Sequence, residues 1–166
     1  MRTGVSEWSA YGKLMIIIGA LIAVPLSVLI FYPEEAGYGL SFFAPALFSA
    51  GLGTLILLAS KSRRQRRNED YSMTKSTGLI VLFAWLWGCT VGALPYYLGD
   101  QLTGIQSLFE SVSGWTTTGL TVSDVAVMPH IFLFYRSFTQ YCGGLGFVLV
   151  MVMVVSEKKA VNLFEG

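Results

Sequence analysis

The residues best suited to chemistry in this sequence form a run of small side chains with closely spaced hydroxyls and carbonyls: Thr116, Thr117, Thr118, Gly119, Leu120 and Thr121. The run follows a short apolar segment, residues 105–115. That segment is too short to cross a bilayer, because a spanning helix needs about 20 apolar residues. Non-helical backbone is tolerated at membrane depth only where protein or water surrounds it. The pattern therefore predicts a re-entrant pore loop, with a pore helix at 105–115 and a filter strand at 116–121.

The filter strand offers ligands for a dehydrated cation. An ion that passes a narrow constriction must exchange its water shell for several oxygens at fixed spacing. We expect the carbonyls of residues 117–120 to face one axis and the Thr117 hydroxyl to add a ligand at the inner end. Gly119 has no Cβ and can adopt backbone angles that other residues avoid. The alternative, from these residues alone, is a threonine-rich turn that caps an ordinary helix.

Three segments carry a resemblance to a known family. Residues 109–121 closely resemble the first pore loop of the Trk/Ktr/HKT family of potassium transporters, with residues 117–121 similar to a potassium-channel filter that keeps one glycine. Residues 136–146 resemble the start of the following helix in bacterial Trk-type members, and residues 162–166 are similar to the segment after it. The resemblance implies a potassium-translocating membrane subunit, with potassium as the transported substrate and no cofactor.

The composition is that of an integral membrane protein. Of the 166 residues, 54% are hydrophobic and 13% are charged, about half the usual charged share of a soluble domain. Cys89 and Cys142 lie in apolar segments and are expected to be small buried side chains. His130 is the only histidine, which argues against a metal site. The spans hold no cluster of acids and histidine, so an enzyme is the weakest hypothesis.

We expect an all-α membrane protein with four transmembrane helices plus one re-entrant pore helix. The expected spans are residues 14–32, 40–59, 78–98 and 131–155. Pro25 should kink the first span without ending it. Residues 1–77 would form an N-terminal transmembrane hairpin and a basic loop, and residues 78–166 a helix–pore loop–helix repeat with a tail.

Charge predicts the orientation of these spans. Basic residues are concentrated at 60–77 and in the tail, and short cytoplasmic loops are rich in Lys and Arg. Both termini are therefore expected on the cytoplasmic side, with the pore loop entering from outside. The family resemblance implies that the membrane is a bacterial inner membrane. The basic loop would contact lipid headgroups and no nucleic acid. The expected outer acids, which would raise the local cation concentration, are Glu34, Glu35, Asp100 and Asp124.

Two charges are expected at membrane depth, Glu110 and Arg136. Buried charges usually pair, so we predict that they bind each other, or backbone carbonyls, and hold the pore helix against the last span. Gly143, Gly144 and Gly146 crowd one turn of that span. Close helix packing is their expected role, and a hinge near the pore is the alternative.

One filter strand cannot surround an ion. Members of the resembled family carry four consecutive repeats, whereas this sequence contains a leading hairpin and the first repeat only. The missing repeats would come from the same longer chain, from a split gene product or from a homo-oligomer, and we favour truncation. The resemblance also implies a cytoplasmic nucleotide-binding regulatory subunit. The alternative function is a non-conducting assembly subunit or a truncated remnant of such a transporter.

Overall fold

This computed structural model describes residues 5–64 and 77–164, and the side chains of 8–60 and 78–148. The described residues form helices and connecting turns, with no strand among them. Their order is α1 (Val5–Ala23), the 3₁₀-helices η1 (Val24–Ile30) and η2 (Pro33–Tyr38), α2 (Gly39–Arg64), α3 (Thr77–Gly92), α4 (Leu94–Leu98), α5 (Gly104–Trp115) and α6 (His130–Phe164). The expected all-α fold is confirmed for this part of the chain.

Among the residues that the structure describes, three helical stretches are long and apolar enough to cross a membrane. They are Trp8–Ile30, Pro33–Ser60 and Gly78–Leu98. They correspond to the first three predicted spans, so the chain is a multi-pass membrane protein. The fourth predicted span, residues 131–155, lies within the continuous helix α6, whose side chains are described only as far as Val148.

Proline changes two of these stretches more than we predicted. Pro25 lacks an N–H group and clashes with the preceding turn, and the α-helix ends at Ala23, with the chain continuing as the tighter 3₁₀-helix η1. The helical stretch nevertheless runs on to Ile30, so Pro25 does not end the span, as predicted. Pro95 similarly lies in the first turn of α4, which is separate from α3. At the other end, α6 runs on to Phe164, beyond the predicted limit of residue 155.

The hairpin of α1 and α2 is closely packed through small residues. A Cβ added to Gly12 would lie 2.8 Å from the Gly53 carbonyl oxygen, so the two backbones nearly touch. Deeper in the bundle, the Ser49 hydroxyl donates to the Met15 carbonyl (2.7 Å), and the Trp87 indole N–H donates to Ser49 (2.9 Å). This chain of hydrogen bonds joins the hairpin to α3.

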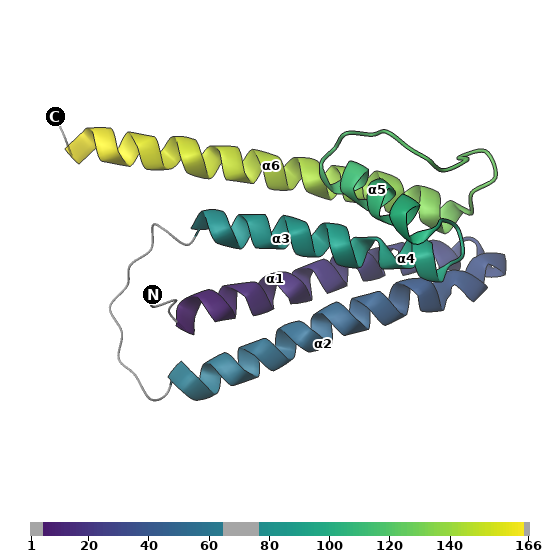
Figure 1. Cartoon of the computed structure of the whole chain (residues 1–166), viewed down its shortest axis with the longest axis horizontal. Coiled ribbons are helices and arrows are strands. Elements are labelled where there is room, and N and C mark those ends of the chain that lie inside the picture. The colour runs from purple at the N-terminus through teal and green to yellow at the C-terminus, as the bar shows by residue number, and fades with distance from the viewer. Residues whose placement is uncertain (1–4, 65–76, 165–166) are drawn as a thin grey trace.

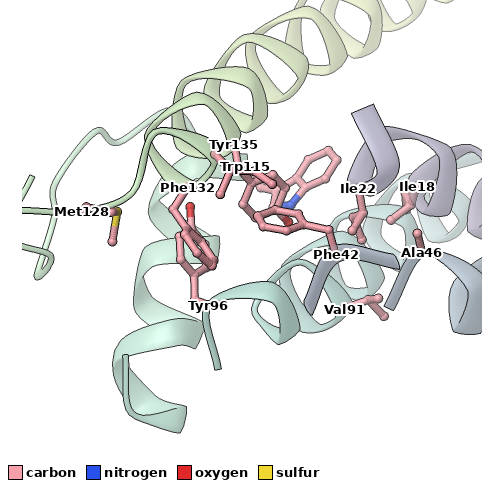
Figure 2. Packing of buried hydrophobic residues seen from close by; sticks show 11 residues of the cluster. Ile18, Ile22, Phe42, Ala46, Val91, Tyr96, Trp115, Met128, Phe132 and Tyr135 are labelled. Atoms are coloured by element: carbon pink, nitrogen blue, oxygen red, sulfur yellow. The ribbon is translucent and has the colours of Figure 1, made fainter. Parts of the chain in front are cut away.

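The hydrophobic core joins the hairpin to the second half of the chain. Figure 2 shows Ile22 and Phe42 of the hairpin meeting Trp115, Phe132 and Tyr135 of α5 and α6. The Phe42 ring lies 5.1 Å from Phe132 and 5.2 Å from Tyr135, centroid to centroid. Aromatic pairs at this separation add to the energy of burial. The two predicted parts of the chain therefore share one core.

The helices place different segments at the two ends of the molecule. Figure 1 shows the start of α1, the end of α2, the start of α3 and the end of α6 at one end, with α5 and the loop before α6 toward the other. The basic side chains predicted to mark the cytoplasmic side, in the loop at 60–77 and at Lys158 and Lys159, lie outside the side chains that the structure describes.

Candidate functional site

Helix α5, at the predicted pore helix, lies in a groove lined by glycines. On α3, a Cβ added to Gly88 would lie 3.3 Å from the Trp115 ring, and one added to Gly92 only 2.8 Å from the Ser111 hydroxyl. On α6, a Cβ added to Gly143 would collide with the Trp115 carbonyl. Small residues thus let α5 approach both neighbours closely, the role expected of Gly143.

The polarity of α5 is inverted relative to a helix of a water-soluble protein. Its buried side carries Ser107, Glu110, Ser111, Ser113 and Gly114. Its exposed side carries the apolar residues Ile105, Leu108, Phe109 and Val112. Buried polar groups need hydrogen-bond partners, and two of these side chains, Glu110 and Ser113, find them in the loop that follows.

The end of α5 is a Schellman motif with an unusual residue. The Thr117 N–H donates to the Gly114 carbonyl (3.0 Å), and the Thr118 N–H donates to the Ser113 carbonyl (3.0 Å). Thr117 has φ +59°, the left-handed conformation that this motif usually gives to glycine. A β-branched residue there is strained. The helix-capping turn that we kept as an alternative is therefore present, but with a threonine where relaxed geometry favours glycine.

The rest of the loop is fastened to the buried side of α5. The Ser113 hydroxyl donates to the Leu120 carbonyl (2.6 Å). Glu110 accepts from the Thr121 hydroxyl with both of its oxygens (2.9 Å each) and from the Val122 N–H (3.1 Å). Two side chains of one helix thus fix the second half of the 116–121 segment.

Arg136 of α6 joins this network, as the sequence predicted. Its Nε donates to Glu110 Oε1 (2.5 Å), and its Nη2 donates to the Gly119 carbonyl (2.8 Å). The Glu110 side chain has no exposed area and the Arg136 side chain is 18% exposed. The guanidinium therefore neutralises a buried carboxylate and holds the loop backbone at the same time, a geometry that its rigid fork suits.

The loop carbonyls fall into two groups. Those of Gly119 and Leu120 accept from Arg136 and Ser113. Within the described residues, no hydrogen bond reaches the carbonyls of Thr116, Thr117 or Thr118. The hydroxyls of Thr116 and Thr118 lie 2.8 Å apart. We expected the carbonyls of residues 117–120 to act alike. Those of Gly119 and Leu120 have protein partners, whereas those of Thr117 and Thr118, and also that of Thr116, have none among the described residues.

The remaining predicted site residues are less closely involved. A Cβ added to Gly144 would make an ordinary contact, 3.6 Å from Thr117 Cγ2, and one added to Gly146 would reach only Trp85, at 4.0 Å. Of the three glycines, Gly143 alone is packed too closely for a Cβ. Among the described residues, no group of three or more His, Cys, Asp or Glu side chains could hold a metal ion.

Glu35 has a role that the sequence did not reveal. It is one of the four acids expected on the outer side, and in the structure it is buried and accepts from the backbone N–H groups of His130 (2.8 Å) and Ile131 (2.9 Å). Glu34, by contrast, is exposed. Two adjacent acids in one turn look alike in sequence, and no local signal separates them. Ser113 was also missed, although a small polar residue near the end of a helix is a common partner for the loop beyond it.

Comparisons with known proteins agree with the resemblance drawn from the sequence. The model of the TrkH family, described as cation transport protein, matches residues 44–161. An uncharacterized cation transporter of Methanocaldococcus jannaschii is 34% identical over 152 residues, which is 90% of this chain and 30% of that protein. No solved structure matches the chain.

Two Escherichia coli proteins are similar over the same region. The Trk system potassium uptake protein TrkG is 35% identical over 134 residues, covering 79% of this chain and 26% of TrkG. The Trk system potassium uptake protein TrkH is 30% identical over 148 residues, covering 87% of this chain and 29% of TrkH. The chain thus spans less than a third of the length of these relatives. By the family match over most of its length, the chain belongs to the TrkH family of cation transport proteins.

Proposed function

We propose that this chain forms one wall of the pore of a Trk-type transporter, through which potassium enters the cell. The observation that carries the proposal is a group of three carbonyls, at Thr116, Thr117 and Thr118 where α5 ends, to which none of the described residues donates a hydrogen bond. The family match and the potassium uptake proteins among the relatives support potassium as the ion.

The path of the chain supports a re-entrant loop. Before α5, Gly99 packs on the Phe132 ring near the start of α6, and at the end of α5 the Trp115 carbonyl packs on Gly143. These two levels are about 16 Å apart along α6, at 1.5 Å per residue. The chain then returns to the start of α6 through residues 116–129 (Figure 1). A depth of about 16 Å is half of a hydrocarbon core about 30 Å thick, so the turning point would lie near mid-membrane.

The backbone of the loop favours carbonyls that point to one side. The φ angle is negative at Thr116 (−87°) and positive at Thr117 (+59°) and Gly119 (+78°). Alternation between the two hands turns successive peptide units so that their oxygens can share a face. The C-terminal end of the α5 dipole adds partial negative charge at the same place. Such an array can replace part of the hydration shell of a potassium ion.

The charged network would keep these oxygens in position without binding the ion itself. Glu110 and Arg136 hold Gly119, Thr121 and Val122. Because Arg136 places positive charge on the Gly119 carbonyl, that oxygen is a weaker cation ligand than those of Thr116–Thr118. The ion site is therefore centred on the inner part of the filter strand.

One wall requires others, and the exposed side of α5 supports their presence. Ile105, in the first turn of α5, is 85% exposed. In the assembled pore, further repeats would cover this apolar side, supplied by the same longer chain, a companion chain or other copies. We further propose that α6 is the fourth span, that the termini lie in the cytoplasm, and that lipids surround the hairpin. A cytoplasmic nucleotide-binding regulatory subunit would bind on that side.

The test compares Gly104, the first residue of α5, with Gly119, in the loop after α5. A Cβ at Gly119 or Gly104 meets nothing within 4 Å, but only Gly119 has a positive φ. In proteoliposomes that contain the full transporter, Gly119→Ser should reduce the preference for K⁺ over Na⁺ about tenfold, since a left-handed non-glycine residue costs about 1–2 kcal/mol. Gly104→Ser should keep the wild-type preference. An unchanged preference in Gly119→Ser would favour a non-conducting assembly subunit.

A further inference from the structure

Glu35 connects the leading hairpin to the start of α6. Its carboxylate, in the η2 turn, reaches across 95 residues of sequence to three donors: the His130 N–H (2.8 Å), His130 Nδ1 (2.8 Å) and the Ile131 N–H (2.9 Å). The imidazole of His130 also stacks on Tyr32, with centroids 4.0 Å apart and planes at 10°. We call this group of Glu35, Tyr32, His130 and Ile131 the latch.

The latch caps the start of α6, where the residue before the helix has no side chain that could do so. The first N–H groups of a helix have no partner within the helix, and a buried helix end needs one from elsewhere. The residue before α6 is Pro129, which has no hydroxyl or carboxylate to cap it. A buried carboxylate supplies both the acceptors and a negative charge that matches the helix dipole.

The latch lies directly upstream of the arginine that holds the filter strand. Arg136 follows Ile131 by five residues, about 8 Å along the helix. Between them, Phe132 and Tyr135 pack on Phe42 of the hairpin. The first two turns of α6 are therefore fixed from the hairpin side, and the Arg136 side chain leaves the second of them toward Glu110 and Gly119.

We propose that the hairpin is a positioning element for ion selectivity, and that Glu35 acts as its positioning residue. By fixing the depth and rotation of the start of α6, Glu35 sets where Arg136 holds the Gly119 carbonyl. This inference rests on the proposed function, and it gives the leading hairpin a task in a pore that would otherwise not need it.

The adjacent acid offers a matched control. Glu35→Ala and Glu34→Ala remove the same charge from the same turn, so a loss of cation attraction at the pore mouth is shared by both. Only Glu35→Ala removes the acceptors of the latch. Glu35→Gln keeps the size and one acceptor oxygen, and it serves as the variant that preserves the fold.

The experiment measures two quantities on the full transporter in lipid vesicles: the preference for K⁺ over Na⁺, and amide hydrogen exchange at residues 130 and 131. In Glu35→Ala, exchange should accelerate about tenfold or more, since a hydrogen bond to a charged group is worth at least that factor in the opening equilibrium. The ion preference should fall in the same variant, fall less in Glu35→Gln, and stay at the wild-type ratio in Glu34→Ala.

Three results would overturn the proposal, and they are distinguishable. A Glu35→Ala transporter with rapid exchange at 130 and 131 but the wild-type K⁺ preference would show that Glu35 only stabilises α6. A wild-type transporter without any K⁺ preference would overturn the proposed function, and the role of the latch with it. An equal loss of preference in Glu34→Ala and Glu35→Ala would assign the effect to charge at the mouth and would also refute the latch.

Discussion

Arg136 is the residue whose replacement tests the site most directly. Arg136→Ala would leave Glu110, with no exposed side-chain area, without a counter-charge. Breaking a buried ion pair costs about 3–5 kcal/mol of unfolding free energy. Glu110 would keep its hydrogen bonds from Thr121 and Val122, so we expect a loss near the lower end, about 3 kcal/mol.

Arg136→Lys tests whether the positive charge of Arg136 is sufficient or whether the forked shape of the guanidinium is also required. A lysine keeps the charge, but its compact ammonium cannot reproduce a fork that reaches Glu110 with Nε and Gly119 with Nη2. We expect it to keep the ion pair and to lose the carbonyl contact, at a cost of about 1.5–3 kcal/mol. The K⁺ preference of the assembled transporter should therefore fall in both variants, although Arg136→Lys is the more stable of the two.

The assay is a double-mutant cycle with Glu110→Gln, read as unfolding free energy in mixed micelles. If the pair holds α5 to α6, Arg136→Ala should cost about 2 kcal/mol less when Glu110 is already Gln than when it is Glu. Additive losses, with a coupling below about 0.5 kcal/mol, would refute the reasoning, because residues in direct contact do not behave independently.

Three further predictions use matched pairs or opposing readouts. Gly143→Ala should cost about 1–3 kcal/mol because its Cβ has no room, whereas Gly144→Ala, with ordinary contacts, should stay within about 0.5 kcal/mol; both are measured by unfolding in mixed micelles. Thr117→Gly should stabilise the chain by about 0.5–1 kcal/mol, because the backbone strain that it removes exceeds the conformational entropy that glycine adds to the unfolded chain. The same change should lower the K⁺ preference in vesicle uptake, because the Thr117 hydroxyl is lost. Ser49→Ala should cost about 1–3 kcal/mol in unfolding free energy, since it removes a buried hydroxyl that accepts from the half-buried Trp87 indole N–H. Thr54→Ala, on the exposed side of the same helix, should cost no more than about 0.5 kcal/mol.

Hydropathy and charge predicted much of this structure because both act over whole segments. An apolar stretch of span length must be a helix in a bilayer, so the first three spans could be located from composition alone. Glu110 and Arg136 could be paired in advance for a similar reason. Charges are costly at membrane depth, and these were the only two expected there.

The details that sequence reasoning missed depend on single contacts. Glu34 and Glu35 are identical in type and neighbours in sequence, and only the position of α6 decides which of them is buried. The left-handed conformation of Thr117 contradicts its own backbone preference, so no propensity could have predicted it. The change from α-helix to 3₁₀-helix after Ala23 was not predicted, because a proline in a span can alter a helix in several ways and tertiary packing decides among them.

The inverted polarity of α5 has a consequence for biosynthesis. During synthesis, an N-terminal segment enters the membrane before any later segment has left the ribosome. The serines and the glutamate of α5 are covered by α3 and α6, both within this chain, and the side left bare is apolar. Under the proposed function, hydrocarbon tails can solvate that apolar side of α5 until further repeats cover it, and no charge is left unpaired there. The carbonyls of Thr116–Thr118, which have no protein partner among the described residues, would be the polar groups that later repeats still have to cover.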